Sequence, residues 1–310
     1  MNACGETPIV FTASDLADGG KVFRELDPPA RLAVFGDPVA HSASPPMHNA
    51  ALKARGLEIQ YVRIRVTSEE LPQALRNLTT AGFLGASLTI PHKQAALPIL
   101  NEVSLESRLM GAVNTVQVVD GKLRGHNTDG PGLSAAIREE FGIPLKELRV
   151  LILGGAGGAG RAITVQCALE GCPGITVANR KTEKGDALAS EIMTARGVKV
   201  DSIALSTLSS EALQSAVANC DLIINATPLG MKADDPSPLP DGLLTAKHLV
   251  YDTVYSGGET ALLKQSKMAR SRCTNGFSML LHQGALQNSL WFGEPAQVET
   301  MRKALTDLSS

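Results

Sequence analysis

Short apolar runs recur along the chain and predict buried β-strands. The first covers residues 32–36 and ends on a glycine, and others cover residues 85–90, 148–153, 175–178, 222–225 and 249–252. Further strands are predicted at residues 59–66 and 199–204, where polar residues stand among the apolar ones. Stretches with helical character lie between several of them, at about residues 46–55 and 68–81 and up to about residue 170. Strands that alternate with helices form βαβ units, whose strands run mostly parallel. The pattern therefore predicts an α/β protein.

The order of these elements indicates two domains, which also suits a length of 310 residues. Residues 1–131 form the first domain in this interpretation, with residues 1–29 as an extension of undefined structure and a strand pair near residues 115–119 and 122–125. Residues 132–279 carry a full series of strands and helices, typical of a doubly wound, Rossmann-type domain. The helical segment 280–310 is expected to complete the first domain.

Composition and charge argue against several classes of protein. The formal net charge is -2 and basic residues are mixed with acidic ones, so the basic patch of a nucleic-acid-binding protein is missing. No apolar run approaches the roughly 20 residues that span a bilayer, and the N-terminus lacks the features of a signal peptide. The five cysteines are scattered, without a CxxC pair, and are expected to be reduced, as in the cytoplasm. The histidines show no metal-ligand spacing, so no metal site is expected.

A glycine-rich turn follows the strand predicted at residues 148–153. The pattern Gly155-x-Gly157-x-x-Gly160 lies between that strand and a helix, and a second strand follows the helix. In a dinucleotide-binding domain one glycine makes the tight turn, one lets the backbone approach a pyrophosphate, and one lets helix and strand pack closely. The residues expected to hold the cofactor here are Gly155, Ala156, Gly157, Gly158 and Ala159. The alternative is a glycine-rich turn that binds no ligand.

The residues after the second strand of this domain indicate which dinucleotide binds. An NAD-dependent enzyme usually carries Asp or Glu there, which accepts hydrogen bonds from the ribose 2′-hydroxyl. This chain has Asn179 and Arg180 at that place, with Lys184 a few residues later, and no carboxylate in the position. Arginine pairs with a 2′-phosphate through two parallel hydrogen bonds. We therefore expect NADP as the cofactor, and the alternative is a solvated, basic start of a helix.

Several short motifs resemble those of the shikimate dehydrogenase family. In order along the chain they are residues 41–45, 88–93, 111–115, 127–130, 155–161, 179–180, 225–228, 251–255 and 276–283. Any one of them alone is weak, whereas the ordered set covers the chain from about residue 31 to residue 294. The resemblance implies an NADP-dependent, reversible reduction of a ring ketone, the conversion of 3-dehydroshikimate to shikimate.

The resemblance assigns the catalytic chemistry to Lys93 and Asp129. Lys93 follows a predicted strand and a proline, and Asp129 stands at the predicted start of a helix. Both are loop or strand-end positions, where open α/β sheets place their ligands. By similarity, Lys93 is the general acid in reduction and the general base in oxidation, and Asp129 orients Lys93 and the substrate hydroxyl. From the residue types alone, a surface salt bridge is the more common explanation.

Ser42 and Ser44 match a family pair that binds the substrate carboxylate with help from a tyrosine, here Tyr255. Two serine hydroxyls provide the donors that a carboxylate needs. Serine is also a common N-cap, and a helix is predicted to start near Pro45 and Pro46, so capping is the alternative role. The two roles are compatible with each other.

Three neutral side chains, Thr89, Asn114 and Gln283, match family residues that bind the hydroxyls of the substrate ring. A polyhydroxylated ring needs groups that both donate and accept hydrogen bonds, which Thr, Asn and Gln provide. Lys93 and Asp129 belong to the same substrate-binding set. The remaining matched cofactor positions are Thr227 and, near the nicotinamide, Thr253, Gly276 and Met279.

The chain departs from the family pattern in three places. Many relatives have Asn two residues before the Thr of the Thr-x-Pro-x-Lys motif, where this chain has Ser87, so two amide donors are lost. The family's Tyr-x-Pro segment is Tyr255-Ser256-Gly257 here, which predicts a less rigid loop. The extension before Arg31 has no counterpart in the resemblance.

Three functions are open at this stage. The first is NADPH-dependent shikimate dehydrogenase. The second is an enzyme of the same family that acts on quinate, or on both acids, with NAD as a further option; quinate's extra hydroxyl would then be discriminated around Ser42, Ser44 and Tyr255. The third is a non-catalytic NADP-binding sensor, against which the presence of both Lys93 and Asp129 argues. In each case the expected protein is a monomer or homodimer with a small-molecule ligand, and neither nucleic acid nor a membrane is an expected partner.

Overall fold

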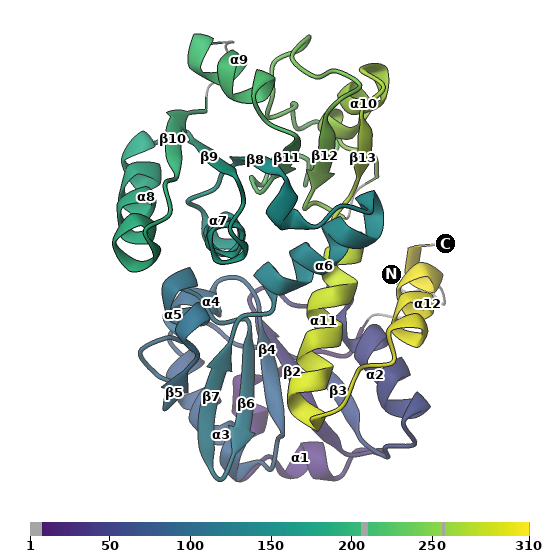
Figure 1. Cartoon of the computed structure of the whole chain (residues 1–310). Helices are drawn as coiled ribbons and strands as arrows, with labels where there is room; N and C mark the ends of the chain where they lie inside the picture. Colours follow the sequence, from purple (N-terminus) through teal and green to yellow (C-terminus); the bar gives the residue numbers. More distant parts are fainter. Residues whose placement is uncertain (1–7, 206–209, 256–257, 310) are drawn as a thin grey trace. The chain divides into compact units, whose positions relative to one another are not determined.

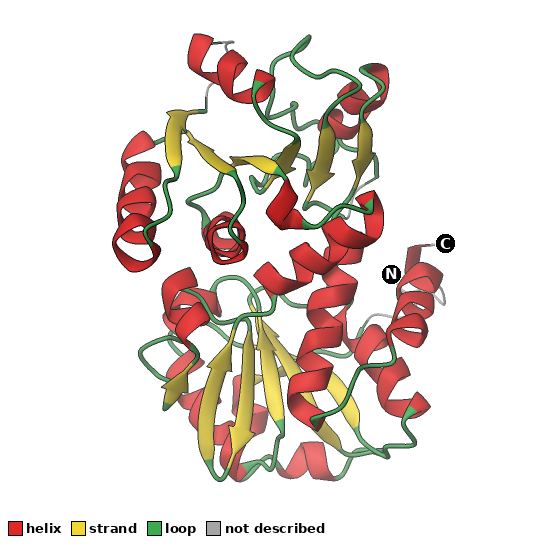
Figure 2. Ribbon diagram, in the orientation of Figure 1, coloured by secondary structure: helices red, strands yellow, loops and turns green. Residues whose placement is uncertain are grey.

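The structure is a computed structural model that describes residues 8–205, 210–255 and 258–309. The chain forms two compact units, each with its own sheet (Figure 1). The first unit runs up to Thr128 and resumes at Leu281, and the second unit spans Asp129–Leu280. Strands and helices alternate in both units (Figure 2), so the predicted α/β class is confirmed.

The first unit is built on a seven-stranded, mixed sheet of order β1-β3-β2-β4-β6-β7-β5. Its strands are β1 (Phe11–Thr12), β2 (Ala30–Gly36), β3 (Gln60–Arg65), β4 (Gly85–Leu88), β5 (Glu102–Val103), β6 (Thr115–Val119) and β7 (Lys122–His126). Strand β6 runs antiparallel to both of its neighbours, and the other neighbouring strands run parallel. The β6–β7 hairpin turns at Asp120 and Gly121, which both have positive φ, as a tight two-residue turn requires.

Helices cover both faces of this sheet. They are η1 (Ala13–Leu16), α1 (Lys21–Arg24), α2 (Ser44–Ala54), α3 (Leu71–Thr80), α4 (His92–Ala95), α5 (Leu105–Met110), α11 (Phe277–Phe292), which enters this unit at Leu281, and α12 (Val298–Ser309). Neighbouring residues of β2 point to opposite faces. Phe35 packs into a core with Leu75 of α3, whereas Val34 packs into a second core with Leu52 of α2 and Trp291 of α11. The sheet is therefore buried on both sides.

Residues 8–29, expected only as an extension, are an integral part of the first unit. Strand β1 pairs in parallel with β3, and Leu16 and Phe23 are fully buried in the same core as Phe35. The Thr12 backbone N–H donates to Asp15 at 2.8 Å and closes the start of η1. Single apolar residues among polar ones give no readable period, which explains why the sequence pattern did not reveal these elements.

The second unit has six parallel strands in the order β10-β9-β8-β11-β12-β13. They are β8 (Arg149–Leu153), β9 (Gly174–Asn179), β10 (Asp201–Ala204), β11 (Leu222–Asn225), β12 (Leu249–Asp252) and β13 (Arg272–Thr274). The helices are α6 (Asp129–Phe141), η2 (Leu145–Glu147), α7 (Gly158–Glu170), α8 (Thr182–Arg196), α9 (Glu211–Ala218) and α10 (Ala261–Met268). Counted from β8, this is the doubly wound order 3-2-1-4-5-6, whose ligands bind beyond the carboxyl ends of the strands where the order reverses. That point lies between β8 and β11.

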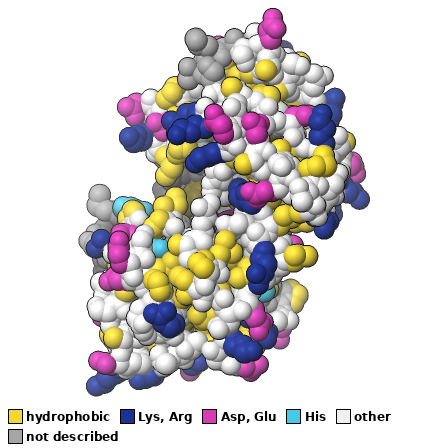
Figure 3. Space-filling model, turned by 90° about the vertical axis from the view of Figure 1, so that its left-hand side faces the viewer, with side chains coloured by type: hydrophobic (Ala, Val, Ile, Leu, Met, Phe, Trp, Pro, Cys, Tyr) yellow, Lys and Arg dark blue, Asp and Glu magenta, His cyan; other side chains and the backbone are white. Residues whose placement is uncertain are grey.

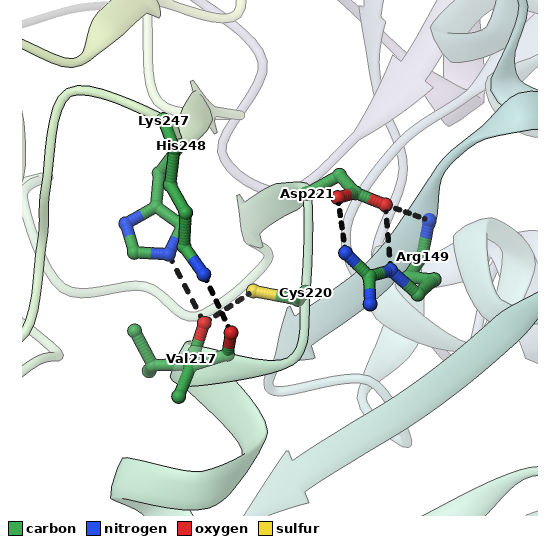
Figure 4. Close-up of polar contacts among 7 residues, drawn as sticks. Arg149, Val217, Cys220, Asp221, Lys247 and His248 are labelled. Atoms are coloured by element: carbon green, nitrogen blue, oxygen red, sulfur yellow. Dashed lines mark hydrogen bonds and ion pairs between the residues drawn. The ribbon is translucent and has the colours of Figure 1, made fainter.

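The amino ends of β8 and β11 are joined by an ion pair (Figure 4). Arg149 donates from Nε and from its backbone N–H to Oδ2 of Asp221, at 2.9 and 3.0 Å, and from Nη2 to Oδ1 at 2.6 Å. The Arg149 guanidinium lowers the pKa of Asp221 to about 2. Nearby, Lys247 and His248 donate to carbonyl oxygens at the C-terminal end of α9. These contacts fasten the end of the sheet opposite to the glycine turn.

Acidic and basic side chains are interspersed over the face of the protein in Figure 3. Among the described residues, no helix is long and apolar enough to cross a membrane. The same residues contain no group of three or more side chains that could hold a metal ion. Cys167, Cys172 and Cys220 are buried thiols and Cys273 is partly buried, whereas Cys4 lies outside the described residues.

Candidate active site

The glycine turn joins β8 to α7 at the carboxyl end of the sheet's central strand. Gly154 has a φ of 78°, a left-handed conformation that other residues rarely adopt. The N–H of Gly157 donates to the carbonyl of Gly154 at 2.9 Å and closes the turn. Gly157 is the N-cap of α7 and offers no side chain to the first N–H groups of the helix. The first N–H groups of α7 and the positive end of its helix dipole are therefore available to bind an anion.

The other glycines of the turn are explained by what a Cβ atom would meet. At Gly155 it would lie 2.6 Å from Cγ1 of Val177, and at Gly160 it would overlap the carbonyl oxygen of Gly154. Both positions exclude a side chain because helix and strand pack closely. A Cβ at Gly158 would meet open space. The turn thus combines close packing on one side with open access on the other, which fits a pyrophosphate.

The carboxyl end of β9 adjoins this turn. The Ala156 N–H donates to Oδ1 of Asn179, the last residue of β9, at 3.0 Å, and Asn179 is 7% exposed. Arg180, Lys181 and Lys184 follow and are exposed, and Lys181 is the N-cap of α8. Among the residues that the structure describes, none of these three cations has an ion-pair partner. The exposed guanidinium of Arg180 therefore belongs to the residue next to Asn179, which contacts the glycine turn.

The carboxyl ends of β11 and β12 supply the next part of the site. Asn225, at the end of β11, accepts from the N–H of Thr227 at 3.0 Å and from its hydroxyl at 2.7 Å. Asn225 also donates to Asp252 at the end of β12, at 2.9 Å. Burial raises the pKa of Asp252. A Cβ at Gly154 would lie 3.0 Å from Cγ2 of Thr227, so Thr227 flanks the glycine turn.

The three positions expected near a nicotinamide fall in one local structure. Gly276 packs so closely on Thr253 that a Cβ would overlap the Thr253 carbonyl. Met279, in the first turn of α11, donates its backbone N–H to the hydroxyl of Tyr251 at 2.9 Å and is 8% exposed. Tyr255 lies in the same unit and is 45% exposed. The expectation that residues 256–257 form a less rigid loop falls outside the described residues.

In the first unit, Asn114 is the centre of a buried polar cluster. It is 1% exposed, and its Oδ1 accepts from the Thr128 N–H and the Thr115 hydroxyl, both at 2.8 Å. Its Nδ2 donates to the Thr128 hydroxyl at 2.9 Å and to Oε1 of Gln283 at 3.4 Å. Two predicted ring-hydroxyl ligands, Asn114 and Gln283, are thus in contact although they stand far apart in sequence.

Lys93 and Thr89 lie on the segment that follows β4. The Thr89 N–H donates to the Phe35 carbonyl at 3.0 Å, which extends the pairing of β4 with β2. Lys93 is half-buried in α4, and its carbonyl accepts from the N–H of Val113 at 2.7 Å. Since Val113 precedes Asn114, the backbone of the lysine segment is fastened next to the polar cluster.

Asp129 is the first residue of α6 and is 5% exposed. A carboxylate in the first turn of a helix is stabilised by the helix dipole. Asp129 directly follows Thr128, whose backbone and hydroxyl are both bonded to Asn114. Asp129 is assigned to the second unit and Lys93 to the first.

Ser42 and Ser44 stand at the start of α2, but neither caps it in the expected way. The N-cap is Ala43, and no side-chain capping bond is present. A capping side chain accepts from the second or third N–H of a helix. Those positions are Pro45 and Pro46, which have no N–H. Ser42 instead accepts from the N–H of Ser44, the first residue of α2, at 3.3 Å.

The sequence analysis missed a buried row of side chains beside Asn114. Tyr61 donates to Ser87, Ser87 donates to Gln287, and Gln287 donates to the backbone carbonyl of Asn114. Tyr61 and Gln287 belong to no motif. The available signal was the spacing of Gln283 and Gln287, since residues four apart share one face of a helix.

The doubly wound unit with its glycine turn, and the α/β unit with its polar cluster, define a dinucleotide-binding protein of two units. Comparisons with known proteins narrow this class. Residues 34–116 match the shikimate dehydrogenase substrate binding domain, and residues 276–306 match the shikimate 5'-dehydrogenase C-terminal domain. Residues 150–233 match the saccharopine dehydrogenase NADP binding domain.

Relatives match along most of the chain. The shikimate dehydrogenase (NADP(+)) of Desulforamulus reducens is 40% identical over 275 residues, which cover 88% of this chain and 93% of the relative. That of Methanopyrus kandleri is 39% identical and covers 89% and 94%. The chain therefore belongs to the shikimate dehydrogenase family.

Solved structures agree with this assignment. The Thermus thermophilus shikimate 5-dehydrogenase, in complex with NADP(H) and shikimate, is 38% identical, with a TM-score of 0.78 over 89% of this chain and 98% of that chain. The Corynebacterium glutamicum quinate dehydrogenase, in complex with NAD, is 31% identical, with a TM-score of 0.79 and the same coverage. The predicted family and fold are thus confirmed, and enzymes with different substrates share this fold.

Proposed function

We propose that this chain is an NADP-dependent shikimate dehydrogenase, which reversibly reduces 3-dehydroshikimate to shikimate. The observation that carries the proposal is the buried cluster around Asn114, in the unit that matches the substrate-binding family model. A ring with several hydroxyls needs neutral groups that donate and accept, and the amides of Asn114 and Gln283 have that chemistry. The relatives named shikimate dehydrogenase (NADP(+)) support both the substrate and the cofactor.

In this proposal the first unit binds the substrate. Asn114, Gln283 and Thr89 bind ring hydroxyls. Ser42 and Ser44 bind the carboxylate, a role supported by the prolines at the second and third positions of α2, which offer no N–H for a serine cap. The phenol of Tyr255, which is exposed in the second unit, adds a further donor to the carboxylate.

The chemical step needs one proton as well as a hydride. The hydride for the ketone carbon is what NADPH would supply when it is bound by the second unit. The Lys93 ammonium donates a proton to the developing alkoxide, and neutral Lys93 removes it in the oxidative direction. Asp129 accepts hydrogen bonds from Lys93 and from the substrate hydroxyl and orients both. The bond from Val113 to the Lys93 carbonyl supports this role because it fixes the segment that carries the lysine.

The second unit binds NADP. Backbone N–H groups of residues 155–159 hold the pyrophosphate, and Asn179 supports the turn beside the ribose. Arg180 and Lys184 bind the 2′-phosphate. This role is supported by their exposure and by their lack of ion-pair partners among the described residues. The other cofactor contacts in this proposal are Thr227, Thr253, Gly276 and Met279.

Quinate is the alternative substrate, because a quinate dehydrogenase shares this fold. That enzyme was solved with NAD, whereas Arg180 in this chain favours NADP. We further propose that the enzyme is cytoplasmic and that it works as a monomer or homodimer.

Initial rates of NADP reduction by shikimate test the proposal, when repeated with quinate and with NAD. We expect kcat/KM for shikimate with NADP to exceed the other three combinations by at least about tenfold, that is roughly 1.4 kcal/mol of discrimination. Comparable rates with quinate would assign a dual-substrate enzyme. NADP binding without turnover of either acid would assign a sensor and overturn the proposal.

A further inference from the structure

Three side chains form a buried hydrogen-bonded row in the first unit, next to Asn114. Tyr61 on β3, Ser87 on β4 and Gln287 on α11 are 1%, 5% and 2% exposed. The Tyr61 hydroxyl donates to the Ser87 hydroxyl at 2.7 Å, and Ser87 donates to Oε1 of Gln287 at 2.8 Å. Nε2 of Gln287 donates to the backbone carbonyl of Asn114 at 3.3 Å. These bonds therefore connect residues of two strands and one helix to Asn114, a candidate substrate-binding residue.

The last acceptor fixes the direction of every bond in this row. A carbonyl oxygen only accepts, so Gln287 must turn Nε2 toward Asn114 and Oε1 toward Ser87. The Ser87 hydroxyl must then donate to Gln287, which leaves Tyr61 as the donor to Ser87. Burial raises the pKa of Tyr61, with partial compensation by hydrogen bonding with Ser87 and Ser44, so the phenol keeps the proton that this order requires.

The row also accounts for Ser87, where the family resemblance has an asparagine. A serine has one proton to donate, and Ser87 gives it to Gln287. Ser87 therefore has no donor left for a substrate. The amide near this position comes from α11 instead, where Gln287 lies one helical turn after Gln283. Both glutamines contact Asn114, one at its side chain and the other at its backbone carbonyl.

We propose that Tyr61, Ser87 and Gln287 are positioning residues that fix Asn114 for substrate binding. The inference rests on the proposed function, in which Asn114 binds a ring hydroxyl. A substrate-binding residue whose backbone and side chain are both held before binding loses less conformational freedom when the substrate binds. Since none of the three touches the reacting atoms, their loss should raise the KM for shikimate and leave kcat nearly unchanged.

Single variants test each member of the row. Ser87→Ala and Gln287→Leu each leave a buried polar group without its partner, so the KM for shikimate should rise about 5- to 100-fold. The change in kcat should stay within about threefold, and the KM for NADP should not change, because the row lies in the first unit. Tyr61→Phe removes only one hydroxyl and keeps the ring, so it is the mildest variant and should give the smallest rise in KM.

Gln117→Leu is the matched control. Gln117 on β6 also donates from its amide to a carbonyl of α11, that of Leu290, at 2.6 Å, but it is not part of the row. Its loss should change the KM for shikimate by less than about twofold. Thermal unfolding of all variants shows whether a rise in KM merely follows a loss of stability.

A double variant tests whether the contact between positions 87 and 287 can be rebuilt with the amide on the strand. Ser87→Asn alone crowds Gln287, and Gln287→Ala alone leaves the Ser87 proton without its acceptor. Together they return the amide to β4 and make room for it. The double variant should have a KM for shikimate within about threefold of the wild type and below that of either single variant. General destabilisation does not produce such non-additivity.

Several results would overturn this inference. One is an unchanged KM in both Ser87→Ala and Gln287→Leu, and another is a KM that rises in parallel with lost thermal stability in every variant, including Gln117→Leu. A double variant worse than both single variants would show that positions 87 and 287 do not act as a pair, and would overturn the row as a unit. A wild-type enzyme inactive with shikimate would overturn the proposed function and this inference together, whereas an active wild type with unaffected variants overturns the inference alone.

Discussion

Lys93 is the residue on which the proposed chemistry depends most directly. Lys93→Ala should lower kcat by roughly 10²–10⁴-fold, the range for a lost general acid–base, and should change the KM for shikimate much less. Lys53→Ala is a suitable control, because Lys53 is an exposed lysine on α2 of the same unit. Steady-state kinetics of both variants decide the question. A Lys93→Ala enzyme within tenfold of the wild-type kcat would exclude Lys93 from the chemical step.

Arg180 should determine the choice of cofactor. Arg180→Ala leaves a 2′-phosphate without its bidentate partner, which costs about 1.5–3 kcal/mol and raises the KM for NADPH roughly 10- to 150-fold. NADH lacks that phosphate, so its KM should barely move. Lys184 retains part of the preference through its charge. Equal increases in both KM values would mean that Arg180 acts on the shared adenosine or on folding.

His48 links the stability of the first unit to pH. It is fully buried on α2, its ring stacks on Tyr61 at 4.5 Å, and neither ring nitrogen makes a hydrogen bond of regular geometry. Burial lowers the pKa of His48 to about 3 from the usual 6.5, an effect that Gln287 partly offsets. Between these values the unfolded chain binds a proton that the folded chain does not. Stability is therefore complete above pH 6.5 and falls as the pH drops toward 3.

The expected slope is about 1.4 kcal/mol per pH unit from this one group. Urea unfolding of the wild type and of His48→Gln, measured at several pH values from 8 down to 5, isolates it. The wild type should lose more of its free energy of unfolding than the variant as the pH falls. A difference between the two proteins that does not depend on pH would contradict the assignment to His48.

Single residues also show what the sequence could not reveal. The motifs that the resemblance identified include Asn114 and Gln283, and the structure brings these two into contact. The serine pair was open to a capping role, but the prolines at the second and third helical positions lack the N–H groups that a cap usually binds, and Ser42 accepts only from the first N–H, that of Ser44. Tyr61 was missed because a tyrosine in a strand carries no local signal of its partners, and for Gln287 the only signal was its four-residue spacing from Gln283. Such partners depend on tertiary packing.

At the scale of secondary-structure elements, the glycine turn permits a paired prediction. Gly158→Ala places a methyl group in open space, so the free energy of unfolding should change little. The same methyl stands where a pyrophosphate would approach, so the KM for NADP should rise at least about tenfold, or roughly 1.4 kcal/mol. Gly160→Ala would overlap the Gly154 carbonyl and should destabilise the protein by about 1–3 kcal/mol. Denaturation and NADP kinetics of both variants test the pair, and a stable Gly160→Ala or a fully active Gly158→Ala would refute it.

The longer elements were predictable because their apolar runs are continuous. The runs at residues 32–36, 148–153, 222–225 and 249–252 all correspond to central strands that are buried on both faces, where no polar alternation is needed. The two-residue strands β1 and β5 and the three-residue strand β13 were missed, because such short pairings leave no periodic pattern. They lie at the edges of the two sheets, where a neighbouring strand rather than the local sequence defines them.

At the scale of the whole molecule, the chain leaves the first unit at Asp129 and returns to it at Leu281. The returning segment is needed to complete that unit. Trp291 of α11 fills one of its cores and donates to the Val116 carbonyl at 3.0 Å. Arg55, at the end of α2, donates to the Glu294 carboxylate and to the Pro295 carbonyl, at 3.0 and 2.6 Å. The two ends of the sequence therefore fold together, and the intervening residues form a unit with its own core.

This organisation predicts that the two ligands protect different parts of the chain against hydrogen exchange. NADP at 100 times its dissociation constant should stabilise what it binds by about 2.7 kcal/mol, and slower exchange should concentrate in peptides that contain the glycine turn and Arg180. Shikimate should slow exchange chiefly in peptides that contain Lys93, Asn114 and Gln283. Exchange measured with each ligand alone separates the two patterns. If shikimate protected only peptides of the second unit, the assignment of substrate binding to the first unit would be wrong, even for an enzyme that turns shikimate over.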